Sequence, residues 1–140
     1  MDEATFEAEG WTRLPTIAFS ENLGAAWVKG PSGQRTVAIM AQERIVNDYG
    51  VVVHGGALMT FADIALGCGA SDALEGKPLV TAQLAYQFAG GVQMGQLITC
   101  EPEIVRKTSS LVFMRGLIKA DGSVVGSVDG IFKALTPREG

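Results

Sequence analysis

Apolar and polar positions alternate along two stretches in the first third of the chain. They read LGAAWVKG (23–30) and QRTVAIMA (34–41), and the turn signal PSG separates them. A period of two on both sides of a Pro-Ser-Gly turn predicts a β-hairpin, and we expect Trp27, Val37 and Ile39 to face inward. Strand pairing therefore begins early in the chain.

A short acidic segment precedes this hairpin. Residues 2 to about 12 carry Phe6 and Trp11 on a mostly acidic background. The pattern indicates a short N-terminal helix that lays its aromatic side chains on the body of the protein.

The central stretch has a different pattern. Residues 51–66 read VVVHGGALMTFADIAL, and no proline interrupts the segment from His54 to about Asp72. Apolar residues cover so much of its helical circumference that the pattern predicts a helix enclosed by other elements. They are Ala57, Leu58, Phe61, Ile64, Ala65 and Leu66.

Four strand-like segments follow this helix. Each is rich in β-branched or aromatic residues and is bounded by Gly, Pro or Asp-Gly. The turn signal ADGS makes a hairpin of the last two. One long helix after two strands and before four predicts an α+β fold, with an antiparallel sheet curved around a central helix. The segments read KPLVTAQLAYQFAGG, GQLITCEPEIVRK, SSLVFMRGLIKADG and SVVGSVDGIFKAL.

Composition narrows the class of protein. The chain has 140 residues, of which 47% are hydrophobic and 19% charged, and its formal net charge is −4. The length favours one domain over residues 1–140, and the charge provides no basic field for a nucleic-acid backbone. We expect a folded single domain that does not bind nucleic acid.

The sequence also suggests a compartment. The N-terminal MDEATFEAEGW lacks the basic and apolar regions of a signal peptide, and no segment approaches about 18 uninterrupted apolar residues. Cys68 and Cys100 lie in apolar surroundings without metal-ligand spacing, which favours reduced core thiols over a disulfide or a site role. We expect a cytoplasmic protein that neither spans nor binds a membrane.

Asp63 is unusual because it lies within the apolar helix with no other charge about one turn away on either side. One interpretation places it on a solvated stripe of the helix. An ionised carboxylate in apolar surroundings costs several kcal/mol unless something pairs with it or uses it. We therefore favour a functional role for Asp63.

His54, Gly55 and Gly56 stand where this helix starts. Glycines let a ligand approach the backbone, and the free amides of a first helical turn can hold a developing oxyanion. The alternative is a tight strand-to-helix turn in which His54 is hydrogen-bonded locally. Gly55 and Asp63 are eight residues apart, which is roughly 12 Å along a helix axis. If both act on one carbonyl, they must come from two subunits across a two-fold axis, so the spacing predicts a dimer with two equivalent sites.

The run NDYGVVVHGG followed by ADIA resembles the signature of hotdog-fold acyl-CoA thioesterases of the PaaI-like, phenylacetate-degradation branch. The resemblance covers most of the chain. It implies the hotdog fold, an acyl-CoA substrate, no metal or other cofactor, and a homodimer as the minimal unit within an expected homotetramer.

The resemblance also implies roles for individual residues. Asp63 matches the catalytic carboxylate, as general base or as nucleophile, and Gly55 matches the glycine whose backbone N–H polarises the thioester carbonyl. His54 matches the histidine that orients the thioester or the adjoining loop, and Thr81 the hydroxyl residue that positions the attacking water. Asn47 matches a loop asparagine that contacts the water or the carbonyl, although three valines separate Gly50 from His54, one residue more than the family pattern. A turn-forming Asn-Asp pair is the alternative for Asn47.

Coenzyme A would need cations for its phosphates. Arg106 and Lys107 lie at a strand-to-strand turn which, in the resembling family, is near the mouth of the nucleotide groove; Arg115 is a weaker candidate. Exposed turns also carry such charges routinely. For the acyl group, Leu58, Met59 and Phe61 are candidates that also suit the core.

Three functions remain at this level. The first is an acyl-CoA thioesterase acting on acyl or aryl-acetyl thioesters. The second is a non-catalytic hotdog module that binds acyl-CoA, which the joint presence of Asp63 and Thr81 disfavours. The third is a hydratase, which the single histidine of the chain disfavours.

Overall fold

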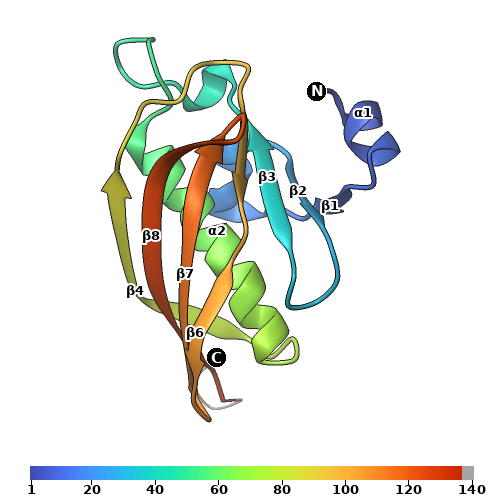
Figure 1. The fold of residues 1–140 in the computed structure, drawn as a ribbon, viewed down its shortest axis with the longest axis vertical. Helices are drawn as coiled ribbons and strands as arrows, with labels where there is room; N and C mark the ends of the chain where they lie inside the picture. The colour runs from blue at the N-terminus through green and yellow to red at the C-terminus, as the bar shows by residue number, and fades with distance from the viewer. Residues whose placement is uncertain (137–140) are drawn as a thin grey trace.

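A computed structural model describes residues 1–136 of the chain and shows one long helix, α2, packed against a curved antiparallel sheet (Figure 1). The N-terminal helix α1 projects beyond the edge of the sheet near β1 and β2. In chain order the elements are α1 (Glu3–Ala8), β1 (Thr12–Leu14), η1 (Ala18–Leu23), β2 (Ala26–Lys29), β3 (Thr36–Met40), η2 (Glu43–Ile45), α2 (Gly55–Ala73), β4 (Leu79–Phe88), β5 (Leu97–Cys100), β6 (Glu103–Lys107), β7 (Leu111–Ala120) and β8 (Ser123–Ala134).

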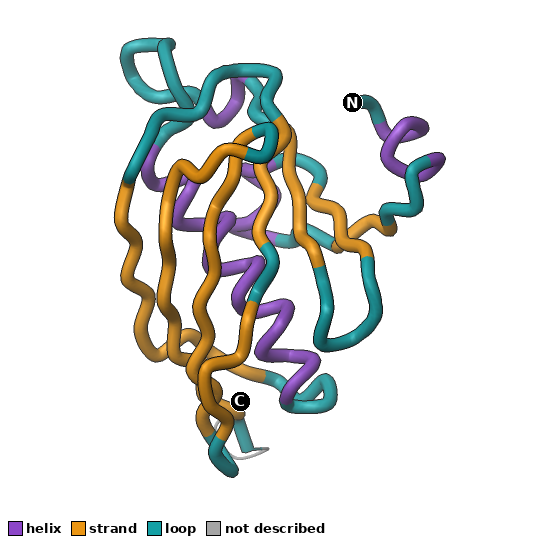
Figure 2. The backbone as a smooth tube through the Cα atoms, in the orientation of Figure 1, coloured by secondary structure: helices purple, strands orange, loops and turns teal. Residues whose placement is uncertain are grey.

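The sheet has the strand order β1-β2-β3-β5-β7-β8-β4, with β6 paired to β7 outside this path. All pairings between these strands are antiparallel. β4 follows α2 in the chain and forms the edge of the sheet beyond β8 (Figure 2). The predicted α+β architecture is confirmed, and its longest edge strand is the one that directly follows the helix.

The first hairpin forms as predicted, but one of its inward residues was assigned wrongly. Trp27 lies opposite Ala38, so these two side chains share one face of the sheet, whereas Val37 and Ile39 point to the other face and enter the main core. Phe6 from α1 stacks on Trp27 with ring centroids 4.7 Å apart. Trp27 is therefore buried under the N-terminal helix and not against α2.

Helix α2 covers the segment expected to be helical and is enclosed mainly on its sheet side. The residues that form its buried face are Leu58, Phe61, Ala62, Ala65, Leu66, Gly69 and Ala70. They pack against inward residues of β3, β5, β7 and β8. On the other side Gly56 is exposed, and Thr60, Asp63 and Gly67 are half-buried. The helix is thus less enclosed in one protomer than its composition suggested.

Within residues 1–136 no helix has the length and apolarity to cross a membrane.

Within residues 1–136, five strands and not four follow α2. The segment expected to be one strand divides into β5 and β6 because Glu101 and Pro102 interrupt the ladder, and proline has no N–H to donate. The turn between β7 and β8 forms at Asp121 and Gly122, whose φ angles are 46° and 87°. Two consecutive residues with positive φ are what the tight turn of a hairpin requires.

Both cysteines are free thiols, as expected from their surroundings. Cys100 is buried, and desolvation raises the pKa of its thiol to about 12. Cys68 is half-buried on α2, and desolvation also raises the pKa of its thiol. Raised thiol pKa values disfavour the thiolate, so neither residue is suited to act as a nucleophile.

Gly126 on β8 allows the close approach of Tyr86 from β4. A Cβ atom at Gly126 would lie 2.5 Å from Cζ and 2.7 Å from Cε1 of the Tyr86 ring. We expect Gly126→Ala to lower the free energy of unfolding by about 1–3 kcal/mol, as overpacking does. Urea denaturation measures this loss.

Gly67→Ala is a control of opposite sign. A Cβ atom at this helical position meets only Phe132, at 3.6 Å, and alanine raises helix propensity, so stability should rise by up to about 1 kcal/mol. A Tyr86→Leu background should remove most of the Gly126→Ala penalty. If the penalty persists there, the contact with the ring is not its cause.

Candidate active site

Asp63 and Thr81 form the polar pair of the site. The hydroxyl of Thr81, near the start of β4, donates a hydrogen bond of 2.6 Å to Oδ1 of Asp63 on α2. The strand pairing is irregular between Thr81 and Gln83, and Thr81 lies opposite Phe132, whose side chain is in the core. Thr81 therefore points toward the helix. Its hydroxyl orients the carboxylate and leaves Oδ2 without a partner among the described residues.

The start of α2 provides one unused backbone amide. His54 is the N-cap, and its Nδ1 accepts a hydrogen bond of 2.8 Å from the N–H of Gly56. The N–H groups of Ala57 and Leu58 bond to the carbonyl of His54. Within residues 1–136 the N–H of Gly55 has no acceptor. The local bond that we held open as the alternative for His54 is present, and it leaves Gly55 as the available donor of the first turn.

One protomer does not bring these two groups to the same place. Asp63 is eight residues along α2 from Gly55, which is roughly 12 Å of axial rise. Thr81, near the start of β4, is hydrogen-bonded to Asp63. Phe88, at the end of β4, places its ring against Gly55. The start of β4 is therefore near the middle of α2, and the end of β4 is near its N-terminus. Sequence reasoning missed Phe88, because its contact with a residue 33 positions earlier depends on how β4 crosses the helix.

Asn47 is engaged in its own loop. Its Oδ1 accepts hydrogen bonds from the N–H groups of Val51, at 3.1 Å, and Val52, at 3.5 Å. Its backbone N–H donates to the carbonyl of Val52, and its carbonyl accepts from Gly50. These bonds give Asn47 the turn-forming role that we held open, and contact with a substrate stays a prediction.

Arg106 and Lys107 are exposed at the end of β6, next to the turn that leads into β7. Neither has an ion-pair partner among the described residues. They are available to an anion, and their contact with phosphate groups stays a prediction.

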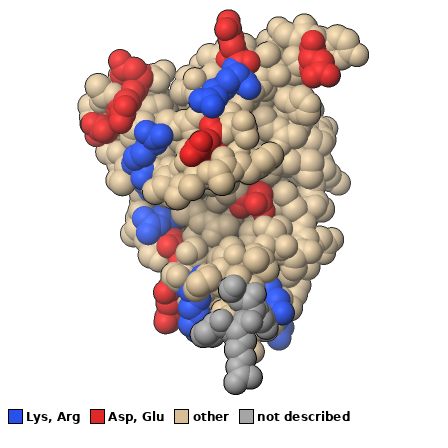
Figure 3. Space-filling model, turned by 180° about the vertical axis from the view of Figure 1, so that it is seen from behind, with Lys and Arg blue, Asp and Glu red and all other residues tan. Residues whose placement is uncertain are grey.

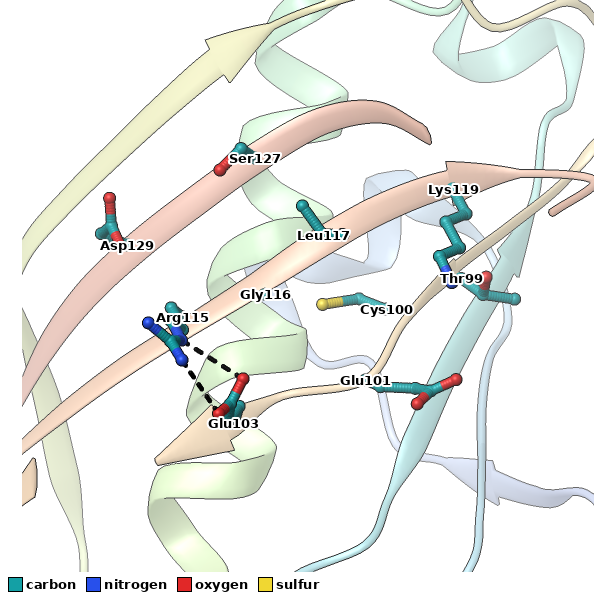
Figure 4. A pocket seen from close by; sticks show the side chains of 10 residues that line it. All are labelled: Thr99, Cys100, Glu101, Glu103, Arg115, Gly116, Leu117, Lys119, Ser127 and Asp129. Atoms are coloured by element: carbon teal, nitrogen blue, oxygen red, sulfur yellow. Dashed lines mark hydrogen bonds and ion pairs between the residues drawn. The ribbon is translucent and has the colours of Figure 1, made fainter. Parts of the chain in front are cut away.

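Arg115 is already paired. Its guanidinium donates to both carboxylate oxygens of Glu103, at 3.2 and 3.1 Å, across the β6–β7 ladder (Figure 4). This hydrogen-bonded pair lowers the pKa of Glu103 and raises that of Arg115. The pair lines a hollow of about 330 Å³ on the sheet, together with Lys119 and Asp129. Because its charge is compensated, Arg115 is a poor candidate for a phosphate ligand.

A second hollow, of about 440 Å³, adjoins the start of α2 and is lined by Phe19, Ile45, His54, Gly56 and Thr60 among others. Seen from the side opposite the sheet, uncharged side chains make up most of the surface (Figure 3). The suggested acyl contacts Leu58 and Phe61 are fully buried in the core of the protomer, whereas Met59 is half-buried. Apolar space beside the helix N-terminus thus comes mainly from residues of η1 and η2.

Comparison with known families identifies the family of this chain. The sequence profile described as the Thioesterase superfamily matches residues 50–127, which is more than half of the chain and includes the whole of α2 and β4. This chain belongs to the Thioesterase superfamily. A relative from Pseudomonas aeruginosa, named "Putative esterase PA0474", is 28% identical over 100 residues, covering 71% of this chain and 74% of that protein.

Solved structures confirm the hotdog fold. The E. coli PaaI protein from the phenylacetic acid degradation operon is similar with a TM-score of 0.70 and 15% identity, over 96% of this chain and 86% of that one. A hypothetical thioesterase from Streptococcus pneumoniae TIGR4, solved with coenzyme A, has a TM-score of 0.73 and 19% identity, over 88% of this chain and 95% of that one. The thioesterase superfamily member therefore has a hotdog fold with PaaI proteins among its structural neighbours.

Proposed function

We propose that this superfamily member is an acyl-CoA thioesterase that hydrolyses acyl or aryl-acetyl thioesters at sites shared between two subunits. The observation that carries the proposal is the placement of the two reactive groups along β4. The Asp63–Thr81 pair lies at the start of this strand, and the unused amide of Gly55 lies at its end, against Phe88. A thioester needs both groups within reach of one carbonyl.

The edge strand supports a dimer. β4 is ten residues long, LVTAQLAYQF, and contains no charged residue and no proline. Natural sheets protect exposed edges with such residues, and an unprotected edge is a template for another strand. The occupant that fits the reaction is β4 of a second copy, paired antiparallel about a two-fold axis near the middle of the strand.

This pairing would assemble complete sites. Antiparallel strands place the end of one opposite the start of the other, so Phe88 and Gly55 of one protomer would face the partner's Thr81 and the partner's Asp63. The symmetry would produce the same arrangement twice. Two such dimers would form the homotetramer that we expect.

The residues fit thioester hydrolysis. As a general base, the carboxylate of Asp63 would take a proton from water while the water oxygen bonds to the acyl carbon, and the N–H of Gly55 would stabilise the oxyanion. The C–S bond then breaks, and the thiolate receives the proton from Asp63. As a nucleophile, the carboxylate would form an anhydride and release the thiolate, and water would then cleave the anhydride. In both routes the bond from Thr81 orients the carboxylate.

Thiolate is a competent leaving group, so the reaction needs no metal or organic cofactor from the protein. Arg106 and Lys107 are the proposed contacts for the phosphates, since they are exposed cations without an ion-pair partner in the described part of the chain. Proteins that carry coenzyme A or acetyl-CoA in their structures share this fold, which supports an acyl-CoA ligand.

The test combines activity and mass. We expect the purified protein to release coenzyme A thiol from hexanoyl-CoA or phenylacetyl-CoA, and light scattering to give two or four times the protomer mass of 14.7 kDa. Binding of acyl-CoA without thiol release would favour the non-catalytic module. An active monomer would contradict the shared site.

A further inference from the structure

Phe88 ends the edge strand with a large apolar ring that one protomer leaves 55% exposed. It packs on Tyr86 of the same strand, with ring centroids 4.4 Å apart and planes 39° apart. Tyr86 is partly buried against the main core, and its hydroxyl is buried with no hydrogen-bond partner among the described residues. Tyr86 therefore covers one side of the Phe88 ring, and within one protomer the rest of the ring is exposed.

The ring of Phe88 lies directly on Gly55. A Cβ atom at position 55 would be 3.3 Å from both Cε1 and Cζ of the ring, which is closer than ordinary van der Waals contact. Phe88 therefore forms one wall of the space at the residue whose N–H is unused. A phenyl ring has no oxygen or nitrogen acceptor for this amide, so the N–H stays available to a carbonyl oxygen.

Resting on the proposed thioesterase function, we infer that Phe88 selects the acyl group. An acyl chain attached to a carbonyl at the N–H of Gly55 starts next to this ring, and its methylene or aryl carbons cover the exposed ring surface. An acetyl group is too small to do so. The ring thus favours substrates with a longer or aromatic acyl group, because burial of apolar surface stabilises their transition states more than that of acetyl-CoA.

Two substitutions of Phe88 test this role. Phe88→Leu retains an apolar side chain without the flat ring, and Phe88→Ala removes the wall. The ratio of kcat/KM for hexanoyl-CoA to that for acetyl-CoA should fall at least about tenfold in Phe88→Ala and by less in Phe88→Leu, which is within the range that methylene contacts contribute to discrimination. The ratio of kcat/KM for phenylacetyl-CoA to that for acetyl-CoA should fall in the same way. The value of kcat/KM for acetyl-CoA itself should change by less than about threefold.

Gln87→Ala is the matched control. Gln87 precedes Phe88 on the same strand, lies opposite Ser127 and points to the other face of the sheet. It tests for a general disturbance of β4, and the substrate ratio should not change.

Binding provides a readout that does not depend on turnover. In dethia analogues of acyl-CoA a methylene group replaces the sulfur, so the carbonyl remains as a ketone that cannot be hydrolysed. By calorimetry, the analogue with a pentyl group on the carbonyl, which matches hexanoyl-CoA, should bind wild type more tightly than the analogue with a methyl group. Phe88→Ala should lose this difference in affinity. A uniform fall in kcat/KM for all substrates, an unchanged ratio, or no binding of either analogue would overturn the role of Phe88. An active wild type with an unchanged ratio would overturn it while the thioesterase function stands.

Discussion

Asp63→Ala should lower kcat for acyl-CoA hydrolysis by at least about a hundredfold, since general-base or nucleophilic participation of a side chain contributes at least that much. Asp63→Asn should lose a similar factor. The amide keeps the shape and can still accept the hydrogen bond from Thr81, but it lacks the charge and the basicity that both routes require. Stopped or continuous assays of thiol release measure these rates.

Asp72→Asn is the matched control on the same helix. The carboxylate of Asp72 accepts hydrogen bonds from Arg35 and from the N–H of Gly33, so it fastens the β2–β3 loop to the end of α2. Its substitution should lower the free energy of unfolding and leave kcat unchanged. Asp63→Asn should lower kcat and leave the free energy of unfolding nearly unchanged. If wild type and both Asp63 variants hydrolyse acyl-CoA at equal rates, Asp63 has no catalytic role.

The helix and the spacing of its polar groups could be predicted because both depend on residues close in sequence. A proline-free apolar run with two glycines at its start determines where α2 begins, and eight residues separate Gly55 from Asp63 in any helical geometry. Only the resemblance pointed to Thr81, and the structure places its hydroxyl on Asp63 through a hydrogen bond between residues 18 positions apart.

The features that were not predicted depend on two properties of the strands: the face of the sheet to which a side chain points, and the strand with which each strand pairs. Trp27 is apolar like Val37, and only the strand register puts it under α1. The bond between Arg115 and Glu103 requires the β6–β7 pairing. Phe88 could have been suspected from Tyr86, because two aromatic side chains at a spacing of two share one face of a strand. The strand alone does not reveal that this face ends on Gly55.

Gly55→Pro should lower kcat by about 10²–10³-fold, the cost of removing one oxyanion donor. Gly55 is the first residue of α2, where proline is well tolerated because the N–H has no helical partner. His54 has φ −59° and ψ 135°, which suits a residue before proline. The substitution therefore removes the donor while the helix start can persist.

Gly55→Ala separates the amide from the added bulk. Both variants place a Cβ atom near the ring of Phe88, but alanine keeps the N–H. Alanine should retain most of the activity that proline loses, and circular dichroism should show equal helix content in both. If alanine and proline lose the same factor, crowding of Phe88 and not the lost donor explains the effect.

Mixing Asp63→Ala with Gly55→Pro should restore activity that neither variant has alone. In a mixed dimer one site combines the intact Gly55 of the first variant with the intact Asp63 of the second, and the other site has neither. If subunits pair at random, half of the dimers are mixed and have one working site of two, so about one quarter of the wild-type activity should return. Replacing the Gly55→Pro partner by the double variant supplies no intact Asp63 and should restore nothing. If the first mixture is as inactive as its components, then each site is built from a single chain, and the two-fold arrangement of β4 strands does not create the catalytic centre.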